Sequence, residues 1–234
     1  PGEHAALVTL PGVAITDLLS LFTTLLITIG FIVLVRERMV RAYRNAAMLD
    51  AVTGIANRRA FDERLSALLA QAARRGTSLA LVMMDADHFK SYNDRYGHVL
   101  GDACLRSLAL SLQATAAESG GSVFRYGGEE FAALVPELDH AAVMALAERL
   151  RLGVRSLRIL HESEAQGIVT VSMGVALAEA GPRGGKPEMA LALIRAADDA
   201  LYQAKQSGRD RIIIMGEGQA PAARPGSASP LLSG

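Results

Sequence analysis

Residues 122–135 read SVFRYGGEEFAALV, and this stretch decides the fold that the sequence predicts. Residues 122–126 and 129–135 are short runs rich in β-branched, aromatic and other apolar side chains, which favour strands. Gly127 and Gly128 lie between them, and this dipeptide tolerates the positive φ angles of a tight hairpin turn. The sequence therefore predicts two adjacent antiparallel strands joined by a glycine turn.

Helical and strand patterns alternate on both sides of this hairpin. Apolar residues at helical spacing predict helices, and short apolar runs predict strands. The predicted helices span 57–73, 100–116, 140–157 and 188–206, and the other predicted strands span 78–84, 168–176 and 211–215. Gly208 closes the last helix. This order predicts an α/β (α+β) domain with a central, mostly antiparallel sheet and surrounding helices.

Composition limits the classes of protein to consider. The chain has 234 residues, half of them hydrophobic, which is enough for one ordinary domain with an appendage. Basic and acidic residues number 24 each, so no global basic surface favours a nucleic-acid partner. The single cysteine, Cys104, excludes an internal disulfide and fits a packing role in a reducing compartment. Because the chain begins at Pro1, we expect a fragment or processed chain whose upstream sensing domains are missing.

A long apolar segment lies near the N-terminus. Residues 18–35 carry no charge, and residues 13–35 add only Asp17, a length that crosses roughly 30 Å of hydrocarbon. The four arginines at positions 36, 38, 41 and 44 follow it against Glu37 alone, which predicts that the next domain is cytoplasmic. A signal peptide and a buried core helix are the alternatives. A signal peptide has a shorter apolar stretch with its basic residues in front, so we expect a single-pass helix in the inner membrane.

The segments flanking the main domain complete the predicted organisation. Residues 1–12 are an N-terminal fragment, 13–35 the membrane helix, 36–49 a helical linker, 50–215 the main domain and 216–234 a disordered tail rich in Gly, Pro, Ala and Ser. Apolar positions 35, 39, 42, 46 and 49 step by four, three, four and three, which suits a coiled-coil seam. A cytoplasmic extension of the membrane helix with one loosely apolar face fits equally well.

Acidic residues stand at two places where predicted strands begin or end. Asp85 follows the apolar run 79–84 and Asp87 comes two residues later, whereas Glu129 and Glu130 follow the glycine pair. Each group alone can be an ordinary solvent-exposed strand end or surface hairpin. Two carboxylates from neighbouring strands suit Mg²⁺, which proteins hold through few carboxylates together with substrate phosphates and water.

Histidine and cysteine offer no competing metal site. His88 and His98 lack an i, i+4 partner and nearby cysteines, so the sequence does not predict a zinc site.

Four segments, in order, resemble the GGDEF domain family. Residues 127–131, GGEEF, match its signature, and residues 85–90, DADHFK, continued by Asn93-Asp94, Gly97-His98 and Gly101-Asp102, match its nucleotide loop. Residues 49–61, LDAVTGIANRRAF, look like the opening segment, and 197–202, ADDALY, with Ala204-Lys205 and Gly208-Arg209, like the closing helix. The resemblance covers residues 50–215.

The resemblance implies a fold, a substrate and a set of site residues. The fold is the palm-like fold of nucleotidyl cyclases, with one GTP held by each protomer of a face-to-face homodimer. Asp85, Glu129 and the backbone carbonyl of Ala86 would bind Mg²⁺, with Mn²⁺ as the alternative ion. Asn93 and Asp102 would read the guanine edge. The remaining residues would approach or neutralise the phosphates: Phe89 through backbone N–H groups, Gly127 and Gly128 by lacking side chains, and Lys90, Lys205 and Arg209 through their charge.

The implied reaction joins two GTP molecules into cyclic di-GMP. The ribose 3′-OH of one GTP attacks the α-phosphorus of the other, and pyrophosphate leaves. Glu129 is the candidate proton acceptor and Glu130 the assisting residue, although the sequence does not divide metal binding and proton transfer between them. Lys90 would stabilise the developing charge. Dimerisation belongs to the mechanism because one half-site cannot complete the product.

One segment departs from the family pattern. Many members carry an Arg-x-x-Asp motif for product inhibition before the signature, and the matching residues here are Glu118, Ser119, Gly120 and Gly121. We therefore expect no tight product inhibition through this segment. Two other functions compete with the main interpretation: a non-catalytic module that binds GTP or a protein partner and relays a signal, and a cyclase that makes a different cyclic nucleotide.

Overall fold

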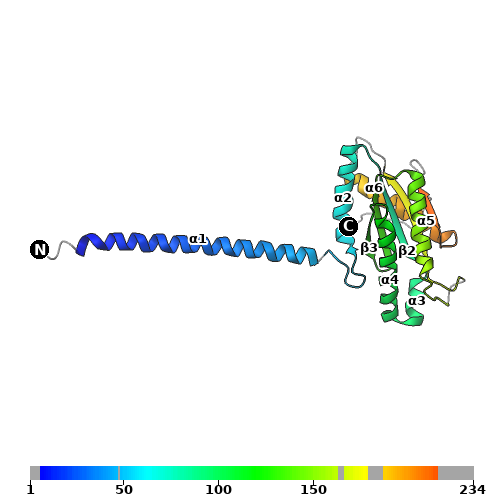
Figure 1. Cartoon of the computed structure of the whole chain (residues 1–234), viewed down its shortest axis with the longest axis horizontal. Coiled ribbons are helices and arrows are strands. Elements are labelled where there is room, and N and C mark those ends of the chain that lie inside the picture. Colours follow the sequence, from blue (N-terminus) through cyan, green and yellow to red (C-terminus); the bar gives the residue numbers. More distant parts are fainter. Residues whose placement is uncertain (1–5, 47, 163–165, 179–186, 216–234) are drawn as a thin grey trace, which may run out of the picture. The chain divides into compact units, whose positions relative to one another are not determined.

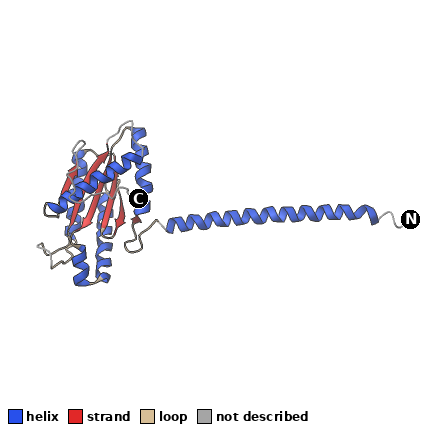
Figure 2. Ribbon diagram, turned by 180° about the vertical axis from the view of Figure 1, so that it is seen from behind, coloured by secondary structure: helices blue, strands red, loops and turns tan. Residues whose placement is uncertain are grey.

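The computed structural model of this protein describes residues 6–46, 48–162, 166–178 and 187–215. It divides at Ala47/Met48 into two compact units, each taken here by itself. The first unit contains helix α1, and the second contains a six-stranded sheet with the other helices (Figures 1 and 2). The predicted tail, 216–234, lies outside the described residues, as do residues 1–5.

Helix α1 runs without interruption from Ala6 to Ala46. Its stretch from Ile15 to Met39 is long and apolar enough to cross a membrane, and none of it is buried within the described structure. The predicted membrane helix and most of the predicted linker thus form one helix. Leu49, the last position of the predicted seam, instead forms an antiparallel bridge with Ala56 and so does not extend the helix.

The sheet has the strand order β1-β3-β4-β2-β5-β6. The strands are β1 (Ala56–Asn57), β2 (Leu79–Ala86), β3 (Ser122–Gly127), β4 (Glu130–Pro136), β5 (Val171–Ala178) and β6 (Ile212–Met215). The three central pairings are antiparallel, and only the outer pairs β1/β3 and β5/β6 are parallel. The mostly antiparallel sheet predicted from the sequence is therefore confirmed.

Helices cover both faces of the sheet (Figures 1 and 2). The helices α2 (Arg58–Arg75) and α6 (Pro187–Gln206) lie on one face, and α3 (Phe89–Tyr96), α4 (His98–Ala117) and α5 (His140–Ser156) lie on the other. The central strand β2 explains this sandwich, because successive side chains of a strand point to opposite faces. Leu79, Leu81 and Met83 pack toward α2 and α6, while the alternate residues 80, 82 and 84 pack toward α4 and α5.

Local capping fixes where several helices begin and end. The Asn57 side chain accepts a hydrogen bond from the Ala60 N–H at 3.2 Å, and Asp139 accepts one from Ala142 at 2.7 Å, which caps α2 and α5. Gly76 ends α2 with φ 70°. The sequence missed the two-residue strand β1 and the helix α3, both of which are too short for a periodic signal.

The hairpin differs in detail from its prediction. Strand β3 extends through Gly127, the turn consists of Gly128 and Glu129, and β4 begins at Glu130. The pairing shifts by one residue between Arg125 and Gly127, which leaves Tyr126 in a bulge. Neither Gly127 nor Gly128 is among the described glycines with positive φ, so the expectation of a positive-φ glycine turn was wrong.

Candidate functional site

Asp85 lies at the end of the central strand β2, beside the hairpin. In the sheet register it stands opposite Glu130 of β4 and Ser172 of β5. The N–H of the next residue, Ala86, donates to the carbonyl of Glu129 at 3.3 Å. The structure thus brings together the three residues predicted to hold a metal, Asp85, Ala86 and Glu129. It does so although Glu129 lies in the turn and not, as expected, in the strand.

The carboxylate of Asp85 is buried and crowded by charge. Only 7% of the residue is exposed, and its Oδ2 lies 2.7 Å from the Lys205 ammonium of α6. Burial raises the pKa of Asp85 to about 6, and the charges of Glu129 and Glu130 add to this rise. The ion pair with Lys205 opposes the shift without cancelling it. The site therefore favours additional positive charge beside Asp85.

Arg125 fastens the hairpin turn to the start of the domain. Its Nε and Nη2 donate to the Gly128 carbonyl at 3.0 and 2.7 Å, and its Nη1 lies 2.7 Å from Asp50 Oδ1. The same Asp50 oxygen accepts from the N–H and hydroxyl of Thr53 at 2.8 and 2.7 Å. Burial opposes ionisation of Asp50, but the bonds from Thr53 and Arg125 outweigh it and lower its pKa. The peptide group that joins Gly128 to Glu129 is therefore held in place through its carbonyl oxygen.

Gly127 lies close to the carboxylate of Glu130. A Cβ atom on this residue would lie 3.1 Å from Oε2 of Glu130, so any side chain would press on that carboxylate. Glu130 therefore folds over Gly127 near Asp85, and both glutamates lie within electrostatic range of Asp85.

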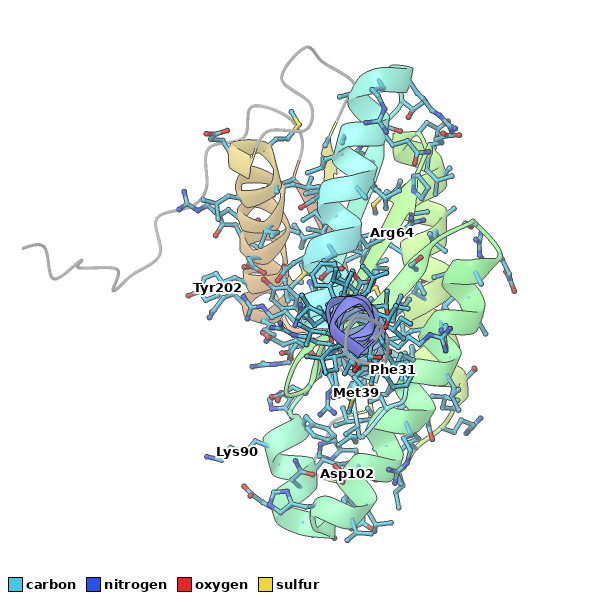
Figure 3. The ribbon with its side chains drawn as sticks, turned by 90° about the vertical axis from the view of Figure 1, so that its left-hand side faces the viewer. Phe31, Met39, Arg64, Lys90, Asp102 and Tyr202 are labelled. Atoms are coloured by element: carbon cyan, nitrogen blue, oxygen red, sulfur yellow. The ribbon has the colours of Figure 1, made fainter. Side chains whose placement is uncertain are left out.

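Helix α3 carries the residues predicted to contact nucleotide. Its N-cap, His88, has a left-handed backbone with φ 54°, after which Phe89 is buried and Lys90 is exposed. Figure 3 shows Lys90 projecting away from α3 and Asp102 lying where α3 and α4 meet. Short as it is, α3 presents its first N–H groups at the same end of the sheet as Asp85.

Asn93 has an unsatisfied acceptor. Its Oδ1 is buried and has no hydrogen-bond partner among the residues that the structure describes. It packs against Gly101 of α4, where a Cβ atom would lie only 1.9 Å from that oxygen. A buried acceptor without a donor is costly, so this oxygen suits a ligand N–H. Asp102, the next residue along α4, is half-buried.

The connection between α6 and β6 supplies the remaining predicted residues. Lys205 lies in the last turn of α6, and Arg209 follows with φ 58° and its N–H bonded to the Ala204 carbonyl at 3.1 Å. Arg209 helps to line a hollow of about 230 Å³. Its other lining residues are His88, Gln166, Ile168, Thr170, Gly208 and Asp210. The hollow thus adjoins the N-terminal end of α3.

The donor set fits a hard cation. Over the described residues, no three His, Cys, Asp or Glu side chains gather as a metal site. Two carboxylates and one carbonyl suit Mg²⁺, which takes oxygen ligands and obtains the rest of its shell from phosphates and water. Cys104 is buried, burial raises the pKa of its thiol to about 12, and it packs in the core.

Sequence reasoning missed the residues that support the site from behind. Asp50 and Arg125 are 75 positions apart, and Asp87 meets Thr170 and Ser172 across more than 80 positions. No periodic pattern links such pairs. The one local signal was Asp50 with Thr53, whose spacing is typical of a side chain that caps a turn.

The comparisons with known proteins agree with this geometry. Residues 47–211 match the family model described as diguanylate cyclase, GGDEF domain. The chain belongs to the GGDEF diguanylate cyclase domain family. The fold class predicted from the sequence, with its sheet, surrounding helices and preceding apolar helix, is confirmed.

Two named bacterial relatives resemble most of this chain. Diguanylate cyclase VdcA of Vibrio cholerae is 34% identical over 180 residues, which are 76% of this chain and 50% of VdcA. The response regulator PleD of Caulobacter vibrioides is 38% identical over 169 residues, which are 71% of this chain and 36% of PleD. This chain therefore spans half or less of the length of these relatives.

A solved structure extends the likeness beyond the domain. The coiled coil and GGDEF domain of DgcB from Caulobacter crescentus, in complex with c-di-GMP, matches with a TM-score of 0.67 and 34% identity. The match covers 84% of this chain and all of that one. The active GGEEF domain of a diguanylate cyclase from Vibrio cholerae matches with a TM-score of 0.59 and 29% identity, over 70% of this chain and 99% of that one.

Proposed function

We propose that this protein is a diguanylate cyclase that condenses two GTP molecules into cyclic di-GMP and two pyrophosphates at a homodimer interface. The observation that carries the proposal is the gathering of Asp85, Ala86 and Glu129 at one end of the sheet, with Lys205 already paired to Asp85 at 2.7 Å. The membership of this chain in the GGDEF family supports the same activity, since relatives such as VdcA are named diguanylate cyclases.

The metal side of the site would consist of Asp85, Glu129 and the Ala86 carbonyl. Bound there, Mg²⁺, or Mn²⁺ as the alternative, would neutralise charge on the phosphates and polarise the phosphorus under attack. The raised pKa of Asp85, caused first by burial and then by Glu129 and Glu130, supports a site that gains by adding a cation. Lys205 would then turn from Asp85 toward a phosphate, where Lys90 and Arg209 add charge.

The guanine side would consist of Asn93 and Asp102. The buried, unsatisfied Oδ1 of Asn93 suits an N–H of the base, and a carboxylate at Asp102 suits the N1–H and amino group of guanine. Adenine offers no N1–H, so this pair supports GTP over ATP. The N–H groups from Phe89 onward, with Gly127 and Gly128, would leave room for the phosphate chain.

Glu129 and Glu130 would handle the proton of the attacking 3′-OH. Both lie close enough to influence the charge of Asp85. A glutamate that helps to hold the metal and faces the hydroxyl can accept its proton as the new bond to phosphorus forms. Two protomers must meet because each GTP supplies one hydroxyl and one α-phosphorus.

The first unit would anchor the enzyme in the inner membrane, with the catalytic domain in the cytoplasm. Leu18 and Phe31 of α1 are 70% and 66% exposed, so the helix shows an uncovered apolar surface. The hydroxyls of Thr24 and Thr28 donate to carbonyls one turn earlier at 2.8 and 2.7 Å, which satisfies them without water. The coiled coil of DgcB supports a dimerising role for the linker at residues 36–49.

Product inhibition through residues 118–121 is expected to be absent. This segment lacks the paired Arg and Asp, and its Ser119 hydroxyl accepts a hydrogen bond from Arg149 at 2.9 Å. We expect added cyclic di-GMP to change the initial rate less than about twofold through this site, since no new charge-assisted bonds form there. An assay in which product strongly suppresses turnover, and Arg149→Ala relieves the suppression, would contradict this expectation.

A direct assay tests the proposed function. The chain is incubated with Mg²⁺ and GTP or ATP, and the product is identified by mass, beside Asp85→Ala and Glu129→Ala. We expect cyclic di-GMP from GTP alone and near-complete loss in both variants. A different product mass would point to another cyclic nucleotide, and undiminished activity in both variants would overturn the site assignment. GTP binding without turnover would favour the non-catalytic relay module.

A further inference from the structure

Asp87 is the one acidic residue of the segment 85–90 that the proposed function leaves without a role. It is 2% exposed, and its carboxylate is saturated with donors from distant parts of the chain. The Thr170 and Ser172 hydroxyls donate to it at 2.7 and 2.6 Å, and the backbone N–H of Asp210 donates at 3.1 Å. Asp87 therefore ties the end of β2 to β5 and to the connection between α6 and β6.

That connection has a strained backbone. Arg209 and Asp210 are consecutive non-glycine residues in the left-handed region, with φ 58° and 44°. Each such residue costs about 1 kcal/mol, so the surrounding structure must hold the turn. The Arg209 N–H is bonded to the Ala204 carbonyl at 3.1 Å, and the Asp210 N–H is bonded to Asp87.

The Asp210 side chain completes the support from the other side. It is 8% exposed, and its carboxylate pairs with Arg151 at 2.7 Å and with Arg155, both on α5. Arg151 also pairs with Glu148, and these two carboxylates raise the pKa of its guanidinium, Glu148 first. The charge of Asp210 is thus neutralised within the protein, although Asp210 lines the same hollow as Arg209.

An anion can therefore enter this hollow without meeting an unpaired carboxylate. The carboxylate of Asp87 accepts three hydrogen bonds, and the carboxylate of Asp210 pairs with two arginines. Arg209 lines the hollow, and its backbone N–H is bonded within the protein. His88, the N-cap of α3, also lines the hollow. Both of these lining residues connect to the Asp85 site: His88 follows Asp85 by three residues, and Arg209 follows Lys205, whose ammonium pairs with Asp85.

We propose that Asp87 and Asp210 are positioning residues: they hold the turn that sets Arg209 at this hollow, which receives the terminal phosphates of GTP. This inference rests on the proposed function and adds to it the residues that act through Arg209. Asp87 is then an anchor, not a third metal ligand.

A double-mutant cycle on the full chain tests the proposal. The probe is 3′-deoxy-GTP with Mg²⁺, which lacks the attacking hydroxyl and therefore binds without being condensed, and GMP serves as the probe without terminal phosphates. Asp210→Asn keeps the shape of the residue and tolerates the left-handed backbone. Asp139→Asn, which replaces one helix cap by an equivalent one, is the matched control.

We expect Arg209→Ala to weaken binding of 3′-deoxy-GTP about tenfold and Asp210→Asn about fivefold, as for lost charge-assisted bonds. The double variant should bind no more weakly than Arg209→Ala, and GMP binding should stay within about twofold in all of them. Arg155→Gln, at a partly exposed position, is a milder second variant with the same expected dependence on Arg209.

Two results would overturn the proposal. Either the losses of 3′-deoxy-GTP binding free energy from Arg209→Ala and Asp210→Asn add up in the double variant, or each variant weakens GMP binding as much as 3′-deoxy-GTP binding. In both cases Asp210 would act on the fold and not through Arg209. If Asp210→Asn fails to fold, Arg155→Gln in the presence and absence of Arg209 decides the question. The proposed function fails separately, if the unchanged chain binds 3′-deoxy-GTP but never converts GTP.

Discussion

Two aspartates at the end of β2 show opposite environments. Asp85 and Asp87 are two residues apart and almost equally buried, at 7% and 2% exposure. Asp85 has one cationic partner and two acidic neighbours, so its pKa is raised to about 6, burial being the main cause. Asp87 accepts three hydrogen bonds. A crowded carboxylate is ready to take a cation, whereas a saturated one serves as an anchor, and the local sequence does not distinguish them.

The largest expected effect is the loss of activity when Asp85, the aspartate with charged neighbours, is replaced. Asp85→Asn should lower the rate of pyrophosphate release at saturating GTP and Mg²⁺ about 10³-fold, because it removes a charged ligand where phosphate charge must be neutralised. Asp139→Asn, far from the site, should leave the rate within about twofold. A variant that kept more than about a tenth of the rate would show that Asp85 does not hold the metal.

Asp87, whose carboxylate accepts three hydrogen bonds, should contribute more to the stability of the fold. Asp87→Ala should lower the free energy of unfolding by about 3 kcal/mol, because it leaves buried hydroxyl and N–H donors without an acceptor. Denaturant unfolding followed by circular dichroism measures this loss. Adding Thr170→Val and Ser172→Ala to Asp87→Ala should recover part of this loss, since the two orphaned hydroxyls are then gone and only the Asp210 N–H is left without its acceptor. No recovery would mean that Asp87 is not an anchor for these residues.

The raised pKa of Asp85 should make its contribution to stability depend on pH. Since the folded pKa of Asp85 lies above its unfolded value, its unfavourable contribution sets in as pH rises from about 4 to 6 and persists above. Without metal, Asp85→Asn should therefore stabilise the chain by roughly 2 kcal/mol at pH 7.5 and by much less at pH 4.5. An equal change at both pH values would contradict the raised pKa.

The smallest effect concerns the tie behind the hairpin. Asp50→Ala and Arg125→Ala should each destabilise the fold, and the double variant should lose about 1 kcal/mol less than their sum, because the two groups share one ion pair. Arg59 and Glu63, which form an exposed pair, provide the control cycle and should show a coupling of about 0.5 kcal/mol or less. If the coupling free energies of the two cycles were equal, the Asp50–Arg125 pair would stabilise the fold no more than an ordinary surface ion pair.

The sequence predicted the elements whose patterns are local. The amphipathic helices, the apolar strands and the grouping of Asp85 with Glu129 follow from spacing along the chain and from the family motifs. The helix α3 was missed because eight residues are too few for a periodic signal, and Asn93 was assigned a role without its helix. The turn was predicted one residue too early, because the bulge at Tyr126 adds a residue to β3 and no sequence pattern indicates such a bulge.

The support behind the site could not be predicted. The Lys205 to Asp85 pair, the Arg125 to Asp50 pair and the Asp210 to Asp87 hydrogen bond each join segments brought together only by the finished sheet. Their residue types are common on protein surfaces, so composition gives no hint. The separation of Asp85 from Asp87 by environment is therefore a property of the tertiary structure.

The most direct test of the central claim is the stoichiometry and enzyme dependence of GTP turnover by the full chain with Mg²⁺. In the proposed mechanism each half-site of a homodimer holds one GTP, so two pyrophosphates should form for each cyclic di-GMP. The specific rate should then rise with protein concentration until all of the chain is dimeric. GTP bound stoichiometrically without pyrophosphate release, at concentrations where the chain is dimeric, would contradict the account.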